Sequence, residues 1–138
     1  MDAYVRRLNP VHLVVLVSAM PLLLGALLAD LAYGRTYEVQ WSNFAAWLLV
    51  GAQVFLTATL VFAVFDFVRA RRLRGDNGLY LLAIAITWLL GFINNLVHAM
   101  DAWQKMPTAA ILSLVATLMI GVAMVLALRG TRDGRAQP

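Results

Sequence analysis

Residues 11–33 read VHLVVLVSAMPLLLGALLADLAY, an apolar run interrupted only by isolated polar residues. As a helix, this run is about 34 Å long, enough to cross the bilayer core of about 30 Å. Three further apolar stretches are 21 to 25 residues long and cover residues 44–68, 79–99 and 107–128. Short connectors make consecutive helices antiparallel neighbours. The sequence therefore predicts an all-α fold: one membrane domain over residues 1–138, a four-transmembrane-helix antiparallel bundle with a polar tail at 129–138.

The composition supports a membrane protein and excludes several other classes. Hydrophobic residues make up 62% of the chain, or about 66% when glycine is counted in place of tyrosine, and charged residues make up 13%. On the count that includes glycine, soluble domains contain about 45–50% hydrophobic residues, with about 25% charged residues. The chain has no cysteine, which excludes disulfides, thiolate metal sites and iron–sulfur ligation. The first apolar run exceeds the 7–15 residues or so of a signal peptide's apolar region, so we expect it to be a retained span.

The basic residues are distributed unequally between the two ends of the predicted bundle. Only Arg35 and Lys105 fall in the first and third connectors. The other nine lie before the first span, between the second and third, or after the fourth: Arg6, Arg7, Arg69, Arg71, Arg72, Arg74, Arg129, Arg132 and Arg135. Because cytoplasmic loops are enriched in Lys and Arg, the sequence predicts that both termini face the cytoplasm.

Polar residues within the spans gather on the opposite side. Asn94 or Asn95, His98 and Asp101 recur at steps of three and four, which places them on one face of a helix. Gln53 falls at a depth similar to that of Asn94, so the two side chains can meet. The candidate ligand-binding cluster is Asp30, Gln53, Asn94, Asn95, His98 and Asp101. It can be read as an interhelical hydrogen-bond network, as a pocket for a quinone head, an ion or a small solute, or as partner contacts.

A second polar pair lies near the cytoplasmic ends of the spans. His12 opens the first span and Asp66 closes the second. We interpret the two as a structural pair joined by a hydrogen bond. Arg69, three residues after Asp66 on the same helix face, is the alternative partner for the carboxylate.

Cofactor and catalytic sites have weak support in the sequence. His12 and His98 should differ in depth by nearly the membrane thickness, so one chain cannot supply both ligands to one haem. A haem b held by His98 from each of two subunits, or by one histidine and another ligand, stays open, as does a quinone. Structural zinc needs four nitrogen or sulfur ligands, and each side has one histidine, so no metal site is predicted. No catalytic residues are predicted, because no nucleophile motif is present.

Motifs along most of the chain, from Leu8 to Gly130, resemble a bacterial membrane family catalogued as domain of unknown function 2231. They are Asn9-Pro10-Val11-His12, Pro21, Ala29-Asp30-Leu31, Trp47, Gly51, Phe65-Asp66, the segment from Asn94 to Trp103, Pro107-Thr108 and Leu112-Ser113. The chain has Asn9-Pro10 where the family commonly has His-Pro, and bulky residues where a glycine usually precedes the second-span aspartate.

The resemblance implies a four-helix inner-membrane protein without an established activity. Members are associated with periplasmic redox enzymes and cytochromes, which implies an anchor or accessory subunit near a quinone or haem. The family's marked positions would be His12, Asp30, Asp66, His98 and Asp101.

The function that we predict is a non-catalytic accessory or anchor subunit of the bacterial inner membrane, which docks to itself or to a larger membrane complex, a redox complex included. No nucleic-acid partner is expected. Small residues at helical spacing predict packing seams: Ser18, Pro21, Gly25 and Ala29, and Ala109, Ser113, Thr117 and Gly121. The first alternative is an electron-transfer subunit with a quinone or haem b near the periplasmic face. The second is an oligomeric transporter or channel, ranked last because broken helices are lacking.

Overall fold

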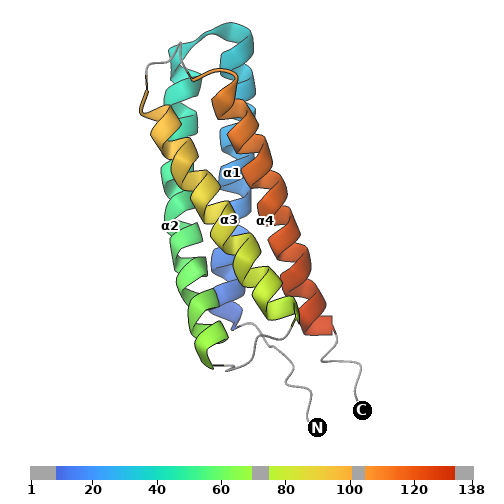
Figure 1. The fold of residues 1–138 in the computed structure, drawn as a ribbon. Helices are drawn as coiled ribbons and strands as arrows, with labels where there is room; N and C mark the ends of the chain where they lie inside the picture. Colours follow the sequence, from blue (N-terminus) through green and yellow to red (C-terminus); the bar gives the residue numbers. More distant parts are fainter. Residues whose placement is uncertain (1–8, 70–74, 101–104, 133–138) are drawn as a thin grey trace.

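The computed structural model describes residues 9–69, 75–100 and 105–132. This part of the chain forms four helices: α1 (Pro10–Thr36), α2 (Val39–Arg69), α3 (Gly75–His98) and α4 (Thr108–Arg132). They run alternately up and down (Figure 1). All four are long and apolar enough to cross a membrane. The predicted all-α antiparallel four-helix bundle is confirmed.

The helices extend beyond several of the apolar segments that predict them. Asn9 caps α1 by accepting a 3.0 Å hydrogen bond from the Val11 N–H at its Oδ1. The helix ends where Tyr37 adopts a left-handed conformation (φ 56°) and donates its N–H to the carbonyl of Tyr33. Because α2 begins only two residues later, most of the expected connector between the first two spans is helical. At the other terminus, α4 continues through Arg132, so the expected polar tail begins inside a helix.

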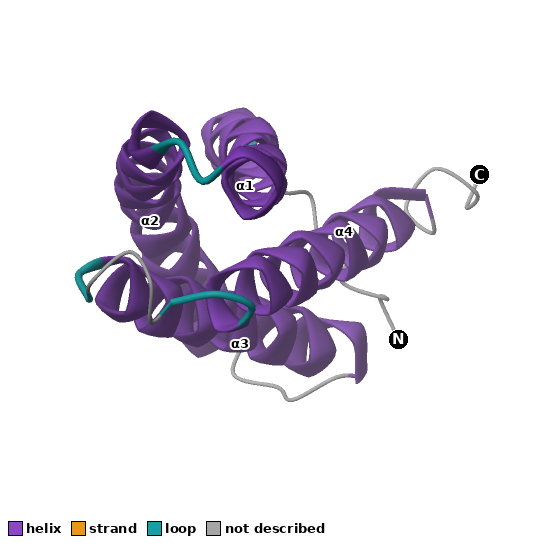
Figure 2. Ribbon diagram, turned by 90° about the horizontal axis from the view of Figure 1, so that it is seen from above, coloured by secondary structure: helices purple, strands orange, loops and turns teal. Residues whose placement is uncertain are grey.

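The four helices form a ring in which each packs against its two neighbours in chain order, with α4 closing against α1. Helices α1 and α3 therefore lie on one diagonal of the ring (Figure 2). The centre is filled by buried leucine and isoleucine side chains together with many buried alanines. Interhelical contact inside lipid depends on such small residues, because lipid tails provide no hydrophobic drive for association.

The two predicted packing seams differ in outcome. On α4, Ala109, Ser113 and Thr117 are buried as expected, and Gly121 is half-buried. On α1, Ala29 is buried as expected and Ser18 and Gly25 are half-buried, but Pro21 is exposed. Residues outside the predicted α1 seam are buried as well: Ala19, Leu23 and Ala26. Four-residue spacing is present in both stripes, so spacing alone does not tell which face of a helix points inward.

Candidate functional site

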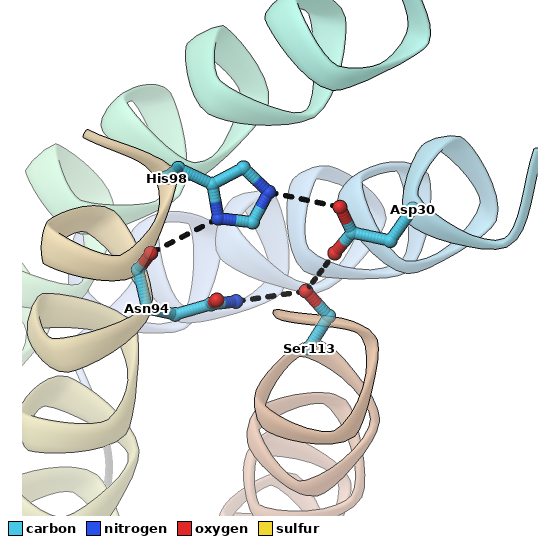
Figure 3. Close-up of polar contacts among 4 residues, drawn as sticks. All are labelled: Asp30, Asn94, His98 and Ser113. Atoms are coloured by element: carbon cyan, nitrogen blue, oxygen red, sulfur yellow. Dashed lines mark hydrogen bonds and ion pairs between the residues drawn. The ribbon is translucent and has the colours of Figure 1, made fainter. Parts of the chain in front are cut away.

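Four polar side chains from three helices meet inside the bundle (Figure 3). Asp30 of α1 lies against His98 of α3, with Oδ1 2.8 Å from Nε2. Its other oxygen, Oδ2, accepts a hydrogen bond from the Ser113 hydroxyl of α4 at 2.5 Å. Asn94 of α3 donates from Nδ2 to the same hydroxyl at 2.8 Å. We call Asp30, Asn94, His98 and Ser113 the Asp30 cluster.

The hydrogen-bond geometry fixes how many protons the His98–Asp30 pair holds. Nδ1 of His98 lies 3.0 Å from the carbonyl oxygen of Asn94, which can only accept, so Nδ1 carries a proton. One further proton must lie between Nε2 and Asp30 to make their contact a hydrogen bond. The pair is then either imidazolium with carboxylate or imidazole with carboxylic acid. Both forms have zero net charge, which lowers the cost of burying them in a bilayer.

The Asp30 cluster is sealed from its surroundings. The side chains of Asp30 and His98 are each 1% exposed, and Asn94 and Ser113 are fully buried. Within the described residues, Oδ1 of Asn94 is enclosed without a hydrogen-bond donor. The cluster is therefore a closed polar core and not a pocket that opens to one face of the membrane.

Lys105 joins this end of the bundle, although the sequence marked it only as a basic residue of a connector. Its side chain is buried, and Nζ lies 5.9 Å from the centroid of the Tyr33 ring. Burial lowers the pKa of Lys105, and the nearby Asp30 carboxylate partly opposes that change. No spacing pattern identifies this residue, because it lies between two helices and outside both of their periodicities.

The buried ammonium of Lys105 predicts a pH-dependent stability. Between its lowered pKa and the ordinary value of 10.5, the unfolded chain binds more protons than the folded one. The free energy of unfolding contributed by this residue therefore rises with pH in that window. Thermal unfolding of the wild type and of Lys105→Met, measured from pH 7.5 to pH 10 in one detergent, should show the wild type gaining stability relative to the variant. Parallel curves would show that the ammonium is solvated.

Gln53 and Asn95 do not belong to the Asp30 cluster. Gln53 donates from Nε2 to the carbonyl of Trp88 at 3.3 Å, and not to Asn94 as the depth argument suggested. Asn95 donates from Nδ2 to the carbonyls of Gly91 (2.9 Å) and Leu49 (3.4 Å). Adjacent residues of a helix point about 100° apart. Asn94 therefore faces α4 while Asn95 faces α2, and the predicted cluster divides into two groups.

Gly91 provides the space that Gln53 occupies, and its replacement by alanine should loosen the contact between α2 and α3. An added Cβ would lie 2.6 Å from Oε1 of Gln53, so the amide must leave its bond to the Trp88 carbonyl. Interhelical hydrogen bonds in membranes contribute about 0.6 kcal/mol on average, and we expect a loss of about 1 kcal/mol relative to Gly121→Ala.

Gly121→Ala is the matched control for this substitution, since a Cβ there meets no described atom within 4 Å. Both variants gain the same helix propensity, up to about 1 kcal/mol. The unfolding midpoints of the two variants, measured in one detergent, test this expectation. Equal midpoints for the two variants would mean that Gln53 moves aside at no cost.

The second polar group lies at the other end of the bundle, where α1 begins. His12 is fully buried, with Nδ1 3.2 Å from Oδ2 of Asp66 and Nε2 2.8 Å from the Tyr80 hydroxyl. The ring of Phe62 stacks on the imidazole at 5.4 Å between centroids. The expected contact between His12 and Asp66 is present. Tyr80 was not foreseen, because a tyrosine near the end of a predicted span is expected in an interfacial aromatic belt.

The histidine environments do not fit haem ligation. Each ring nitrogen of His12 and of His98 already faces a hydrogen-bond partner. An iron ligand needs a free nitrogen lone pair, so one of these bonds would have to break. Among the described residues, no group of three or more His, Asp or Glu side chains is placed to hold a metal ion. Asp101, which the sequence added to the candidate cluster, lies outside the described residues.

Comparisons with known proteins identify the family of the chain but no activity. No curated protein matches the sequence, and no solved structure matches the fold. A family model described as "Predicted membrane protein (DUF2231)" matches residues 8–131. This match covers all four helices up to the penultimate residue of α4 and includes both polar groups. The chain is a multi-pass membrane protein, and it belongs to the DUF2231 family of predicted membrane proteins.

Proposed function

We propose that the protein is a non-catalytic accessory or anchor subunit that docks to itself or to a larger membrane complex. The closure of the Asp30 cluster carries this proposal. Asp30 or His98 could act in catalysis only by touching a substrate, and these two side chains are each 1% exposed and bonded to one another. Groups so placed hold helices together and present no reacting atom. A rigid scaffold is the role that such a core supports best.

We further propose that the membrane is the bacterial inner membrane and that both termini face the cytoplasm. Nine of the 11 basic residues fall on the side of the bundle where both termini lie, which supports this orientation. The Asp30 cluster would then lie nearer the periplasm, and His12 nearer the cytoplasm.

The two alternatives have less support. An electron-transfer subunit with haem b would require His98 to give up either Asp30 or the carbonyl of Asn94. A transporter or channel built by several copies would need polar groups along a path. Asn94 is instead turned into the bundle toward Ser113, and each of the four helices is continuous.

The mass of the protein in its native assembly tests the proposal. The full chain is extracted in a mild detergent such as digitonin, and its mass is measured by light scattering after cross-linking in intact membranes. We expect a defined multiple of 15.2 kDa, or a fixed ratio to other membrane proteins. A monomer that carries no other protein, before and after cross-linking, would overturn the accessory role.

Two controls separate this outcome from the alternatives. Asp30→Asn should assemble as the wild type does, because in a scaffold the cluster acts only through the fold. A visible spectrum and a solvent extract of the same preparation test for bound haem and quinone. A Soret band, or one quinone per chain, would favour the electron-transfer alternative.

A further inference from the structure

The outer surface between α2 and α3 contains a groove of about 600 Å³. Its lining is mainly apolar, with Val54 and Phe92 among its walls, and includes the polar residues Gln53, Thr57 and Asn95. The volume lies within the range of about 300–1,000 Å³ that is typical of small-molecule sites. Because both helices are membrane spans, a molecule would reach this groove from the lipid.

The polar hydrogens of Asn95, Thr57 and Trp88 around the groove already have partners inside the protein. Both hydrogen bonds of Asn95 Nδ2 go to backbone carbonyls, those of Leu49 and Gly91. The Thr57 hydroxyl donates to the carbonyl of Gln53 at 2.7 Å, and the Trp88 indole N–H donates to Thr57 Oγ1 at 2.9 Å. Apart from the second Nε2 hydrogen of Gln53, the groove offers a ligand hydrogen-bond acceptors.

Oε1 of Gln53 accepts no hydrogen bond from the described residues but is enclosed by protein, so the acceptor open to a ligand is the amide oxygen of Asn95. Carbonyl oxygens only accept, so the two bonds of Asn95 Nδ2 fix the orientation of the amide. Its Oδ1 is not enclosed by protein and accepts no hydrogen bond from the described part of the chain. The bilayer core has no water to supply a donor, and an acceptor without one is costly there.

We propose that this groove binds a lipid-soluble molecule with a hydroxyl group on a flat aromatic ring. The hydroxyl donates to Oδ1 of Asn95, and the ring packs along Phe92. Phe92 is 43% exposed and is stacked parallel to Trp88, with 2° between the planes, so it presents a flat aromatic wall. The hydrogen bonds that join α2 and α3 account for the N–H groups of Asn95, but they give no role to its amide oxygen, Oδ1.

A pair of probes isolates the hydroxyl hydrogen. The full chain is placed in nanodiscs of palmitoyl-oleoyl-phosphatidylcholine, and bound 4-octylphenol and 4-octylanisole are measured by native mass spectrometry, corrected for their uptake by empty nanodiscs. The two differ only in that a methyl group replaces the hydroxyl hydrogen. Hydrogen bonds inside membranes predict about 3- to 20-fold tighter binding of the phenol. Equal binding would overturn the proposal.

Two further probes test the ring and the natural form of the ligand. 4-Octylcyclohexanol keeps the hydroxyl but lacks the flat ring, and it should bind more weakly than the phenol; equal binding would overturn the aromatic part. Ubiquinol-2 has hydroxyl donors and ubiquinone-2 has none. A preference for ubiquinol-2 assigns the groove to quinols, whereas a preference for octylphenol alone assigns it to other phenols.

Variants place the effect at Asn95. Asn95→Leu removes the acceptor, so the ratio of phenol to anisole affinity should fall to about 1. Val54→Phe fills the groove and should weaken both probes without disturbing the core, because Val54 is 64% exposed. Val61→Phe, at a 48% exposed position of α2 outside the groove lining, is the matched control and should bind both probes as the wild type does. A ratio that survives in Asn95→Leu, or normal binding by Val54→Phe, would overturn the assignment.

Discussion

Replacing Asp30 with leucine is expected to lower the free energy of unfolding by about 3–5 kcal/mol. The substitution leaves Nε2 of His98 and the Ser113 hydroxyl buried without the carboxylate that both contact. Removing one member of a buried pair costs more than the pair contributes, because the remaining group stays desolvated. Equilibrium unfolding in mixed micelles, followed by far-ultraviolet circular dichroism, measures this change.

Asp30→Asn is the matched control for this expectation. An asparagine side chain can donate from Nδ2 to Nε2 of a neutral His98 and accept from Ser113 at Oδ1, so both hydrogen bonds are kept. We expect a loss of about 1 kcal/mol or less. Equal losses for the leucine and asparagine variants would contradict this expectation, since they would show that keeping the two hydrogen bonds preserves no stability.

The second large effect is expected at His12. His12→Ala removes a fully buried ring that stacks on Phe62 and bonds to Tyr80. The cavity and the loss of the hydrogen bond to the Tyr80 hydroxyl together predict a destabilisation of about 3 kcal/mol. The same unfolding measurement applies.

A double-mutant cycle with Tyr80→Phe separates the hydrogen bond from the cavity. The phenylalanine keeps the ring and removes the hydroxyl, at an expected cost of about 1 kcal/mol. The double variant should lose less than the sum of the single losses, since both remove the same bond. Strict additivity would indicate that His12 and Tyr80 contribute independently.

The two histidines have a common architectural role. In a ring of four helices, α1 and α3 lie on a diagonal and do not pack directly. His98 reaches across this diagonal to Asp30 near one end, and His12 reaches Tyr80 near the other. Each bond thus joins helices that backbone packing leaves apart. Such bonds resist a change in the spacing of α1 and α3, which the small residues between neighbouring helices cannot do.

Much of the fold could be predicted because it depends on length and composition. A span of about 20 apolar residues has few alternatives to a membrane helix, since every backbone polar group in lipid must be bonded within its own segment. The contact between His12 and Asp66 could also be predicted from the sequence, because both residues lie near the ends of neighbouring antiparallel helices. Pro21 shows where this reasoning fails: it shares the spacing of a seam yet faces outward.

Length and hydrophobic pattern are enough to predict a bundle of four antiparallel membrane helices with polar groups near both ends. Which polar residues meet depends on how the helices pack. In the packed bundle, Asn94 bonds to Ser113 and Asn95 to the carbonyl of Leu49, and Lys105 is buried beside Tyr33. Packing also separates the closed Asp30 cluster from a groove that opens to lipid. The physical reason is that hydrophobicity sets the depth of a residue in the bilayer, whereas the rotation of each helix about its axis is set by packing against its neighbours.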